Sequence, residues 1–144
     1  MKVKQLSVFL ENKPGRLGHP CEVLAAAGIN ILTLCLADTE KFGLLRLIVD
    51  DPEKARKALE KAGCAVNVAD VLAIEVADHP GGMEAVLAVL EPAGINVDYM
   101  YAFTLKRGRN AIMIVRFSDT DKAMDLLKKN GINVLKSVAL YEST

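Results

Sequence analysis

The sequence predicts an α+β protein made of two copies of one strand–helix–strand–strand–helix–strand unit. A polar–x–Pro–Gly turn follows an apolar alternating run twice, beginning at Asn12 and at Asp78. The tripeptide Gly-Ile-Asn ends at Asn30 and again at Asn96. The two turns lie 66 positions apart, and the two tripeptides are separated by the same 66 positions. Chance composition explains this equal spacing poorly.

The first copy contains the signals of all six elements in order. Alternation predicts a strand, helical spacing predicts a helix that ends at Gly28, and β-branched runs predict a hairpin. Asp51 then caps a second helix, which Gly63 ends, and a last strand begins. We expect these elements at residues 3–10, 17–28, 29–37, 43–50, 51–63 and from residue 65 onward.

The second copy repeats this order, with two extra residues in its hairpin loop. Asp119 caps its second helix, and Pro92 should distort or shorten the end of its first helix, because proline removes a backbone hydrogen bond. We expect strand, helix, two hairpin strands, helix and strand at residues 71–76, 83–90, 95–105, 110–117, 119–131 and 132–141.

These patterns predict two domains, residues 1–70 and 71–144, each with two helices on one face of an antiparallel sheet. Such a unit is a ferredoxin-like sandwich. Only Ala69-Asp70 separates the two copies, which is too short for a flexible linker. We therefore expect residues 65–77 to form one long strand that both units share.

The composition excludes several classes of function. The formal net charge is zero, which argues against a nucleic-acid partner. No apolar run approaches the roughly 20 residues that a membrane span requires. Three cysteines, an odd number in apolar surroundings, fit reduced thiols better than disulfides and predict a cytoplasmic protein.

The repeated turn has the chemistry of an amino-acid site. Gly15 and Gly81 lack a Cβ, so a ligand can approach the backbone closely. The helix that follows begins with unpaired N–H groups, which attract a carboxylate. Asn12 and Asp78 can accept hydrogen bonds from an ammonium group. A plain capped turn remains the alternative interpretation.

The tripeptide is a weaker signal than the turn. It occurs a third time at residues 131–133, again where a helix passes into a strand. Glycine at a helix end followed by isoleucine in a strand is common at such junctions. The motif alone is therefore more consistent with a structural role.

The N/D-x-P-G-x-L/M turn, the A-G-I-N that follows it and the βαββαβ order together resemble the ACT domain family. The resemblance covers the whole chain as two tandem ACT units, as in small stand-alone amino acid-binding ACT proteins. In that family the ligand lies where two units pair side by side. The resemblance implicates Asn12, Lys13, Pro14, Gly15, Arg16, Leu17 and Asn30, and Asp78, His79, Pro80, Gly81, Gly82, Met83 and Asn96.

The two predicted sites differ from each other. Asn12 stands where many members of the family carry Asp, so the first site lacks a formal charge for the ammonium group. Gly82 replaces a larger residue in the second site. We therefore expect unequal sites, one of which could be empty.

Catalysis and metal binding have little support. His19 and His79 lie near no nucleophile motif, and Cys21 shares an apolar helical stripe. We expect no catalytic residue, no metal and no cofactor. The sequence favours a non-enzymatic, homodimeric amino-acid sensor that regulates a metabolic enzyme or transcriptional partner allosterically and in trans. The alternatives are a ligand-independent protein-interaction module and, less favoured, a small metal-binding protein.

Overall fold

The computed structural model describes residues 2–38, 41–103, 108 and 110–136. It divides into two compact units, which we treat separately. We call Lys4–Ala69 the N-terminal unit, and Met1–Val3 with Asp70–Thr144 the C-terminal unit.

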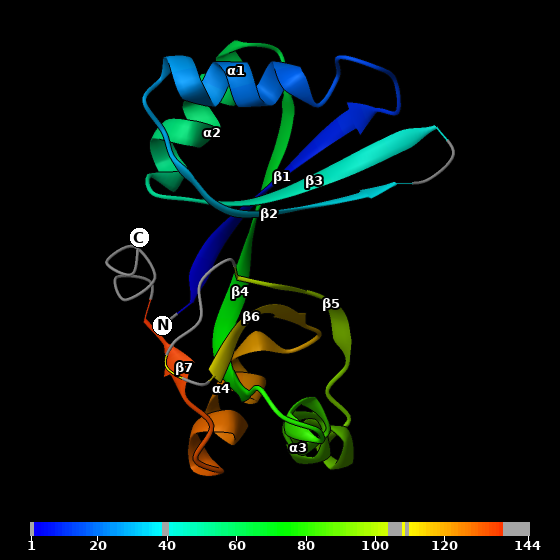
Figure 1. The fold of residues 1–144 in the computed structure, drawn as a ribbon, viewed down its shortest axis with the longest axis vertical. Helices are drawn as coiled ribbons and strands as arrows, with labels where there is room; N and C mark the ends of the chain where they lie inside the picture. Colours follow the sequence, from blue (N-terminus) through cyan, green and yellow to red (C-terminus); the bar gives the residue numbers. More distant parts are fainter. Residues whose placement is uncertain (1, 39–40, 104–107, 109, 137–144) are drawn as a thin grey trace. The chain divides into compact units, whose positions relative to one another are not determined.

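The N-terminal unit has the expected order of elements. Its sheet has the strand order β2-β3-β1-β4, and β3 pairs antiparallel with both β1 and β2. Figure 1 shows α1 and α2 on one side of this sheet. The elements are β1 (Val3–Glu11), α1 (Gly18–Ala26), β2 (Ile31–Asp38), β3 (Phe42–Val49), α2 (Pro52–Lys61) and β4 (Ala65–Ala77).

The C-terminal unit repeats this arrangement, with the second half of β4 as its first strand. Its strand order is β5-β6-β4-β7, and all of these pairings are antiparallel. The further elements are α3 (Gly82–Leu90), the 3₁₀ helix η1 (Glu91–Ala93), β5 (Val97–Ala102), β6 (Asn110–Phe117), α4 (Thr120–Lys129) and β7 (Val134–Leu135). The α+β, ferredoxin-like fold class predicted from the sequence is confirmed.

Several local predictions are also confirmed. Strand β4 runs without interruption from Ala65 to Ala77, as the short junction requires. Pro92 lies in η1, so α3 ends at Leu90 and the chain tightens into a 3₁₀ turn. Of the last expected strand, β7 covers Val134–Leu135, and residues 137–141 lie outside the described part of the chain.

The second helix of each unit begins after one capping aspartate, as predicted. The Asp51 carboxylate accepts a hydrogen bond from the Lys54 amide (3.2 Å), and the Asp119 carboxylate accepts one from the Lys122 amide (3.1 Å). Each bond satisfies one of the helix's otherwise unpaired N–H groups. This fixes where α2 and α4 start.

Each unit has its own hydrophobic core between its helices and its sheet. In the N-terminal unit, Leu24 and Leu59 of the helices pack against Leu47 of the sheet. In the C-terminal unit, Leu127 of α4 packs in a cluster with Leu72 and other buried strand residues. Each unit therefore buries its own apolar strand residues beneath its helices.

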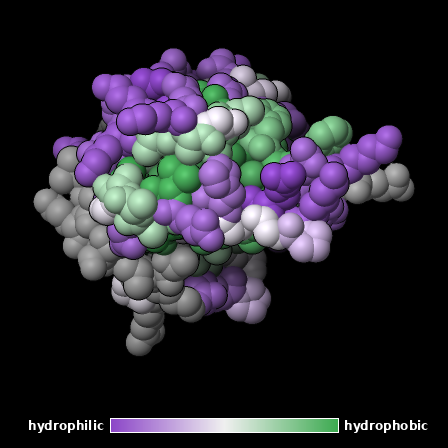
Figure 2. All heavy atoms as spheres, turned by 90° about the horizontal axis from the view of Figure 1, so that it is seen from above, coloured by the Kyte–Doolittle hydropathy of each residue, from purple (hydrophilic) through white to green (hydrophobic). Residues whose placement is uncertain are grey.

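Surface hydrophobicity is distributed unevenly between the units. Figure 2 views the chain from the end at which α1 lies in Figure 1, and hydrophobic residues gather in the middle of this face. Among the described residues, the exposed large apolar side chains all belong to the N-terminal unit: Phe9, Leu17, Leu34, Leu36, Phe42 and Val68. No helix within the described ranges is long and apolar enough for a membrane crossing.

Gly82 is required by packing at the start of α3. A Cβ built on this residue would lie 1.9 Å from the carbonyl oxygen of Ala77 at the end of β4. Backbone atoms cannot yield as a flexible side chain can, so the helix can approach the strand only with glycine here. This explains the small residue that the sequence shows at this position.

We expect Gly82→Ala to lower the free energy of unfolding by about 1–3 kcal/mol, because the added methyl group forces α3 away from β4. Thermal unfolding of the two proteins measures the effect. Gly18→Ala, in the first turn of α1, is the matched control because a Cβ there meets nothing within 4 Å. Equal melting temperatures for Gly82→Ala and the wild type would contradict this packing.

Candidate functional site

The glycines of the two Pro-Gly turns share a left-handed backbone conformation. Gly15 has a φ of +84° and Gly81 a φ of +86°, both in the left-handed region that favours glycine. A Cβ built on either residue would meet nothing within 4 Å. The glycines are therefore needed for the backbone conformation, and no side chain of the described residues fills the space beside them.

The helices that follow the two turns begin differently. Helix α1 starts at Gly18 with no acidic residue in its first turn, and Pro20 removes one of the N–H groups there. Helix α3 starts directly after Gly81 and carries Glu84 in its first turn. This carboxylate opposes the binding of a second anion, so the N-terminus of α1 is the better place for a ligand carboxylate.

A pocket of about 130 Å³ lies beside the turn of the N-terminal unit. We call it the turn pocket. Of the predicted residues, Asn12, Lys13 and Leu17 line it, whereas Pro14, Gly15 and Arg16 lie in the same turn but outside its lining. The complete lining is Leu10, Glu11, Asn12, Lys13, Leu17, Leu36, Asp38 and Gly43.

Sequence reasoning missed the charges that the sheet brings to this pocket. Gly43 of β3 pairs with Leu10 of β1 on one side and with Asp38 of β2 on the other. The Asn12 backbone N–H donates to the Lys41 backbone carbonyl (3.1 Å), so a hydrogen bond connects the turn to the same hairpin. Asp38 therefore supplies, from another strand, the carboxylate that Asn12 lacks.

Lys13 and Glu11 form an ion pair in the turn pocket. The Lys13 Nζ lies 3.1 Å from the Glu11 Oε2, and both side chains are well exposed. The hydrogen bond from Lys13 and the positive charges of Lys13 and Arg16 hold the pKa of the Glu11 carboxyl below its ordinary value. The pocket thus presents charges of both signs within one small space.

The two asparagines of the tripeptides lie elsewhere. The Asn30 backbone N–H donates to the Asp50 carboxylate (3.1 Å), and the Asp50 backbone N–H donates to the Asn30 backbone carbonyl (3.2 Å). Asn96 makes the same reciprocal pair with Ser118, at 2.9 Å for each bond. Both asparagines close the open end of a hairpin, and neither is part of the lining of the turn pocket.

The predicted residues of the second turn are spread over different surroundings. Asp78, Pro80 and Gly81 are exposed, and Met83 packs against the core of the C-terminal unit. His79 and Gly82 line a pocket of about 310 Å³. This pocket also contains the third Gly-Ile-Asn, residues 131–133.

A polar triad occupies that second pocket. The Glu75 carboxylate accepts a hydrogen bond from the Asn110 side-chain amide and another from the Asn133 side-chain amide, both at 2.9 Å. The triad joins β4, β6 and the segment that enters β7. Its charge-assisted hydrogen bonds hold the start of β7 against β4.

The described residues include no group of three or more His, Cys, Asp or Glu side chains that could hold a metal ion. Cys21, Cys35 and Cys64 are free thiols, each half-buried. Burial raises the pKa of the Cys64 thiol above its ordinary value, so this group stays neutral at neutral pH. We therefore take the turn pocket, which has side chains of both charges, as the candidate ligand site.

A fold of two βαββαβ units, each with a glycine turn ahead of its first helix, defines a class of paired ferredoxin-like domains. The family model of the ACT domain pair matches residues 1–143. The chain belongs to the ACT domain family. None of the curated proteins matches the chain.

Several solved structures are similar to this chain in fold. Protein BT0572 from Bacteroides thetaiotaomicron is 43% identical, with a TM-score of 0.91 over 98% of this chain and 96% of that one. The regulatory subunit of aspartate kinase from Thermus thermophilus is 15% identical, with a TM-score of 0.63 over 89% and 92%. The E. coli aspartokinase III complex with lysine and aspartate is 17% identical, with a TM-score of 0.51 over 90% and 31%.

The Lys13–Glu11 pair gives a test of the pocket's geometry. We expect the Glu11 pKa to move back toward its ordinary value in Lys13→Met, because Lys13 is the main cause of the shift. A carboxyl-detected NMR titration measures both proteins, with Lys57→Met as a control on another element. Because the folded-state pKa is lowered, the pair's small contribution to stability is present above the ordinary pKa of glutamate. It is lost as the pH falls through the folded-state value. An unchanged Glu11 pKa in Lys13→Met would contradict the pairing.

Proposed function

We propose that the protein is a non-enzymatic amino-acid sensor. An α-amino acid binds beside the Pro-Gly turn at an interface between ACT units and controls a metabolic enzyme or transcriptional partner in trans. The observation that supports this most is the pairing of opposite charges in the turn pocket, which matches a zwitterion. The free cysteines are in keeping with a reducing compartment, so we place the protein in the cytoplasm.

In the N-terminal unit each end of the ligand's main chain has a counterpart. The Lys13 ammonium, which carries three donors, binds the ligand carboxylate together with the first N–H groups of α1. Asp38 and the Asn12 side-chain oxygen accept hydrogen bonds from the ligand ammonium. Gly15 keeps the approach to the turn open.

The rim of the turn pocket is apolar and exposed. Leu36 is 48% exposed and Leu17 is 38% exposed. Strand β2 is an edge strand, so a second ACT unit can pair beside it and cover these side chains together with the ligand. The ligand is then buried at the interface between two units, in accordance with the family resemblance.

We assign the remaining predicted residues to the same function. In the N-terminal unit, Pro14 and Arg16 shape the turn, and Asn30 contacts a ligand held by a paired unit. In the C-terminal unit the proposed ligand-binding residues are Asp78, His79, Pro80, Gly81, Gly82, Met83 and Asn96. We expect this second site to be weaker, because Glu84 lies in the first turn of α3.

A ligand-independent protein-interaction module is the second candidate function. It is favoured by the exposed aromatic side chains of the N-terminal unit, of which Phe9 is 56% and Phe42 60% exposed. Such a module would capture its partner equally well with and without amino acids. A sensor would require the ligand or be released by it.

Thermal unfolding in the presence of each of the twenty amino acids tests the sensor. We expect at least one to raise the melting temperature, since a ligand at 100 times its dissociation constant stabilises the folded state by about 2.7 kcal/mol. Asp38→Asn should weaken this ligand at least tenfold by removing the partner of its ammonium group. Asp125→Asn, an exposed carboxylate of α4, is the matched control and should bind normally. A flat response to all twenty amino acids at millimolar concentration would contradict the proposal.

A further inference from the structure

The pocket around the polar triad of the C-terminal unit has a charged side and an apolar side. We call it the triad pocket; its volume of about 310 Å³ is that of a small organic ligand's site. Glu75 alternates along β4 with the core residues Ile74 and Val76, so its carboxylate lies on the sheet face away from the helices. Val86 of α3 and Ile132 line the pocket from the core side. A ligand here therefore meets a carboxylate on one side and aliphatic side chains on the other.

Hydrogen bonds orient the polar groups of the triad pocket in advance of any ligand. The Asn110 and Asn133 side chains each direct their NH₂ group to the Glu75 carboxylate, at 2.9 Å. The orientation of both amides is thereby set, which leaves their side-chain oxygens as acceptors. The His79 Nδ1 lies 2.9 Å from the Pro80 carbonyl, which can only accept, so Nε2 of the neutral ring is an acceptor too. The pocket presents a preorganised set of acceptors around one carboxylate.

The charges at the triad pocket favour a positive ligand. Glu75 is the carboxylate among the described residues that line the pocket, and that lining includes no lysine or arginine. Glu84 adds a negative charge in the first turn of α3, the turn that brings Gly82 and Ala85 to the lining. A ligand carboxylate is repelled by these charges, whereas a cation with several N–H donors forms charge-assisted hydrogen bonds.

The N-terminal unit has a pocket at the corresponding place, and that pocket contains a cation of its own. Arg16 lines it at the position of Gly82, and residues 63–65 line it at the position of residues 131–133. Glu11 lines the same pocket. One copy of this hollow thus holds an arginine and a carboxylate together, whereas the other copy has glycine in place of the arginine.

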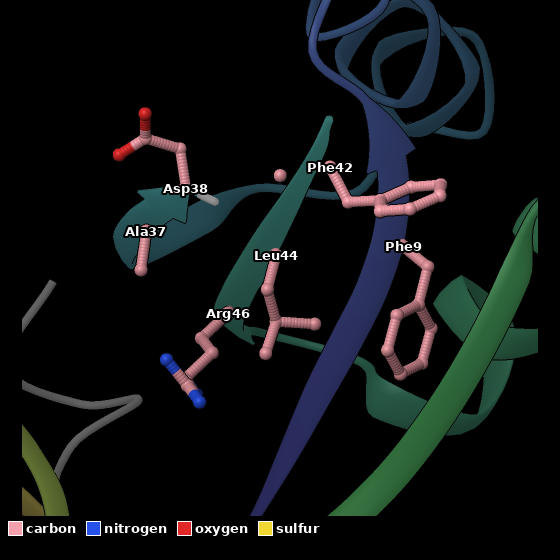
Figure 3. A pocket seen from close by; sticks show the side chains of 7 residues that line it. Phe9, Ala37, Asp38, Phe42, Leu44 and Arg46 are labelled. Atoms are coloured by element: carbon pink, nitrogen blue, oxygen red, sulfur yellow. The ribbon is translucent and has the colours of Figure 1, made fainter. Parts of the chain in front are cut away.

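The triad distinguishes the C-terminal unit from the N-terminal unit. Glu75 corresponds in register to Phe9, and Asn110 corresponds to Phe42. Figure 3 shows these two aromatic rings in the N-terminal unit, Phe9 on β1 and Phe42 on β3. The same fold therefore forms with two aromatic rings where the C-terminal unit has a hydrogen-bonded carboxylate and amide. The βαββαβ fold does not in itself require the polar groups.

We propose that the triad pocket binds a small organic cation, an alkylammonium or alkylguanidinium. Its N–H groups donate to the Glu75 carboxylate and to the side-chain oxygens of the two asparagines. Its carbon chain packs against Val86 and Ile132, which are aliphatic. Gly82 leaves the position that Arg16 takes in the other copy, so the ligand supplies the cation from outside.

This site is separate from the turn pocket that the sensor function uses. The two pockets belong to different units and share no residue of their linings. His79 and Gly82 are also part of the weaker second amino-acid site proposed above. A simple alkyl cation has no carboxylate, so its binding tests the triad pocket alone. Loss of the sensor function would leave the cation site standing.

Isothermal titration calorimetry of the full chain with n-butylguanidinium and n-butylammonium chloride tests the site. We expect both cations to bind, and sodium butyrate, which has the opposite charge, not to bind. Glu75→Gln keeps the shape of the side chain, removes its charge and should weaken both cations at least tenfold. The same change in Asp125→Asn, on α4 and outside the pocket, is the matched control and should bind normally. A wild type that binds neither cation at millimolar concentration, or equal binding by Glu75→Gln, would overturn the proposal.

A second variant blocks the triad pocket without changing the triad. Ala85 lines the pocket from an exposed position of α3, so Ala85→Leu fills space there without disturbing the core. We expect this variant to bind both cations at least tenfold more weakly, with the circular dichroism of the wild type. Ala88→Leu, one turn further along α3 and outside the lining, is the matched control and should bind normally. A folded Ala85→Leu protein with wild-type affinity for the cations would refute this pocket as their site.

Discussion

The pairing of Gly43 with two strands at once is the constraint on which the candidate site depends. Strand β3 lies between β1 and β2, so Gly43 aligns Leu10 with Asp38. The turn that leaves β1 and the end of β2 must then lie side by side. A Cβ on Gly43 would already touch Leu36 at 3.4 Å, so a small residue keeps the floor of the pocket open. The charge of Asp38 reaches the turn through sheet register rather than through sequence proximity.

The duplication provides an internal comparison of what the fold requires and what it merely permits. Both copies keep the left-handed glycine of the turn, the aspartate that caps the second helix and the backbone pair at the open end of the hairpin. These features fix the chain path, so they are present in both units. In contrast, Phe9 and Phe42 of the first sheet correspond in register to Glu75 and Asn110 of the second. The first turn of α3 carries Glu84, whereas that of α1 has no acidic residue. The differing features are therefore not required by the fold.

Much of the fold could be predicted because its determinants are local in sequence. Asp51 and Asp119 cap helices through residues three positions away, and Pro92 acts on its own turn. The candidate site was predictable only in part. The Pro-Gly turn was recognisable, but Asp38 belongs to the pocket through cross-strand register, which spacing along the chain does not reveal. The clash that requires Gly82 depends on a helix–strand distance, which is also invisible in a linear pattern.

If the proposed function holds, the size of the units limits how amino-acid binding can be converted into regulation. Each unit has one compact core, and a small ligand in a pocket of about 130 Å³ touches only the turn and the adjoining strand ends. A ligand shifts an equilibrium only by its difference in affinity for the two states. The pocket rim is apolar and exposed, so the state that differs most in affinity is the one in which another surface covers the ligand. The proposed sensor would therefore regulate through assembly, because another surface must cover the pocket before the ligand is fully enclosed.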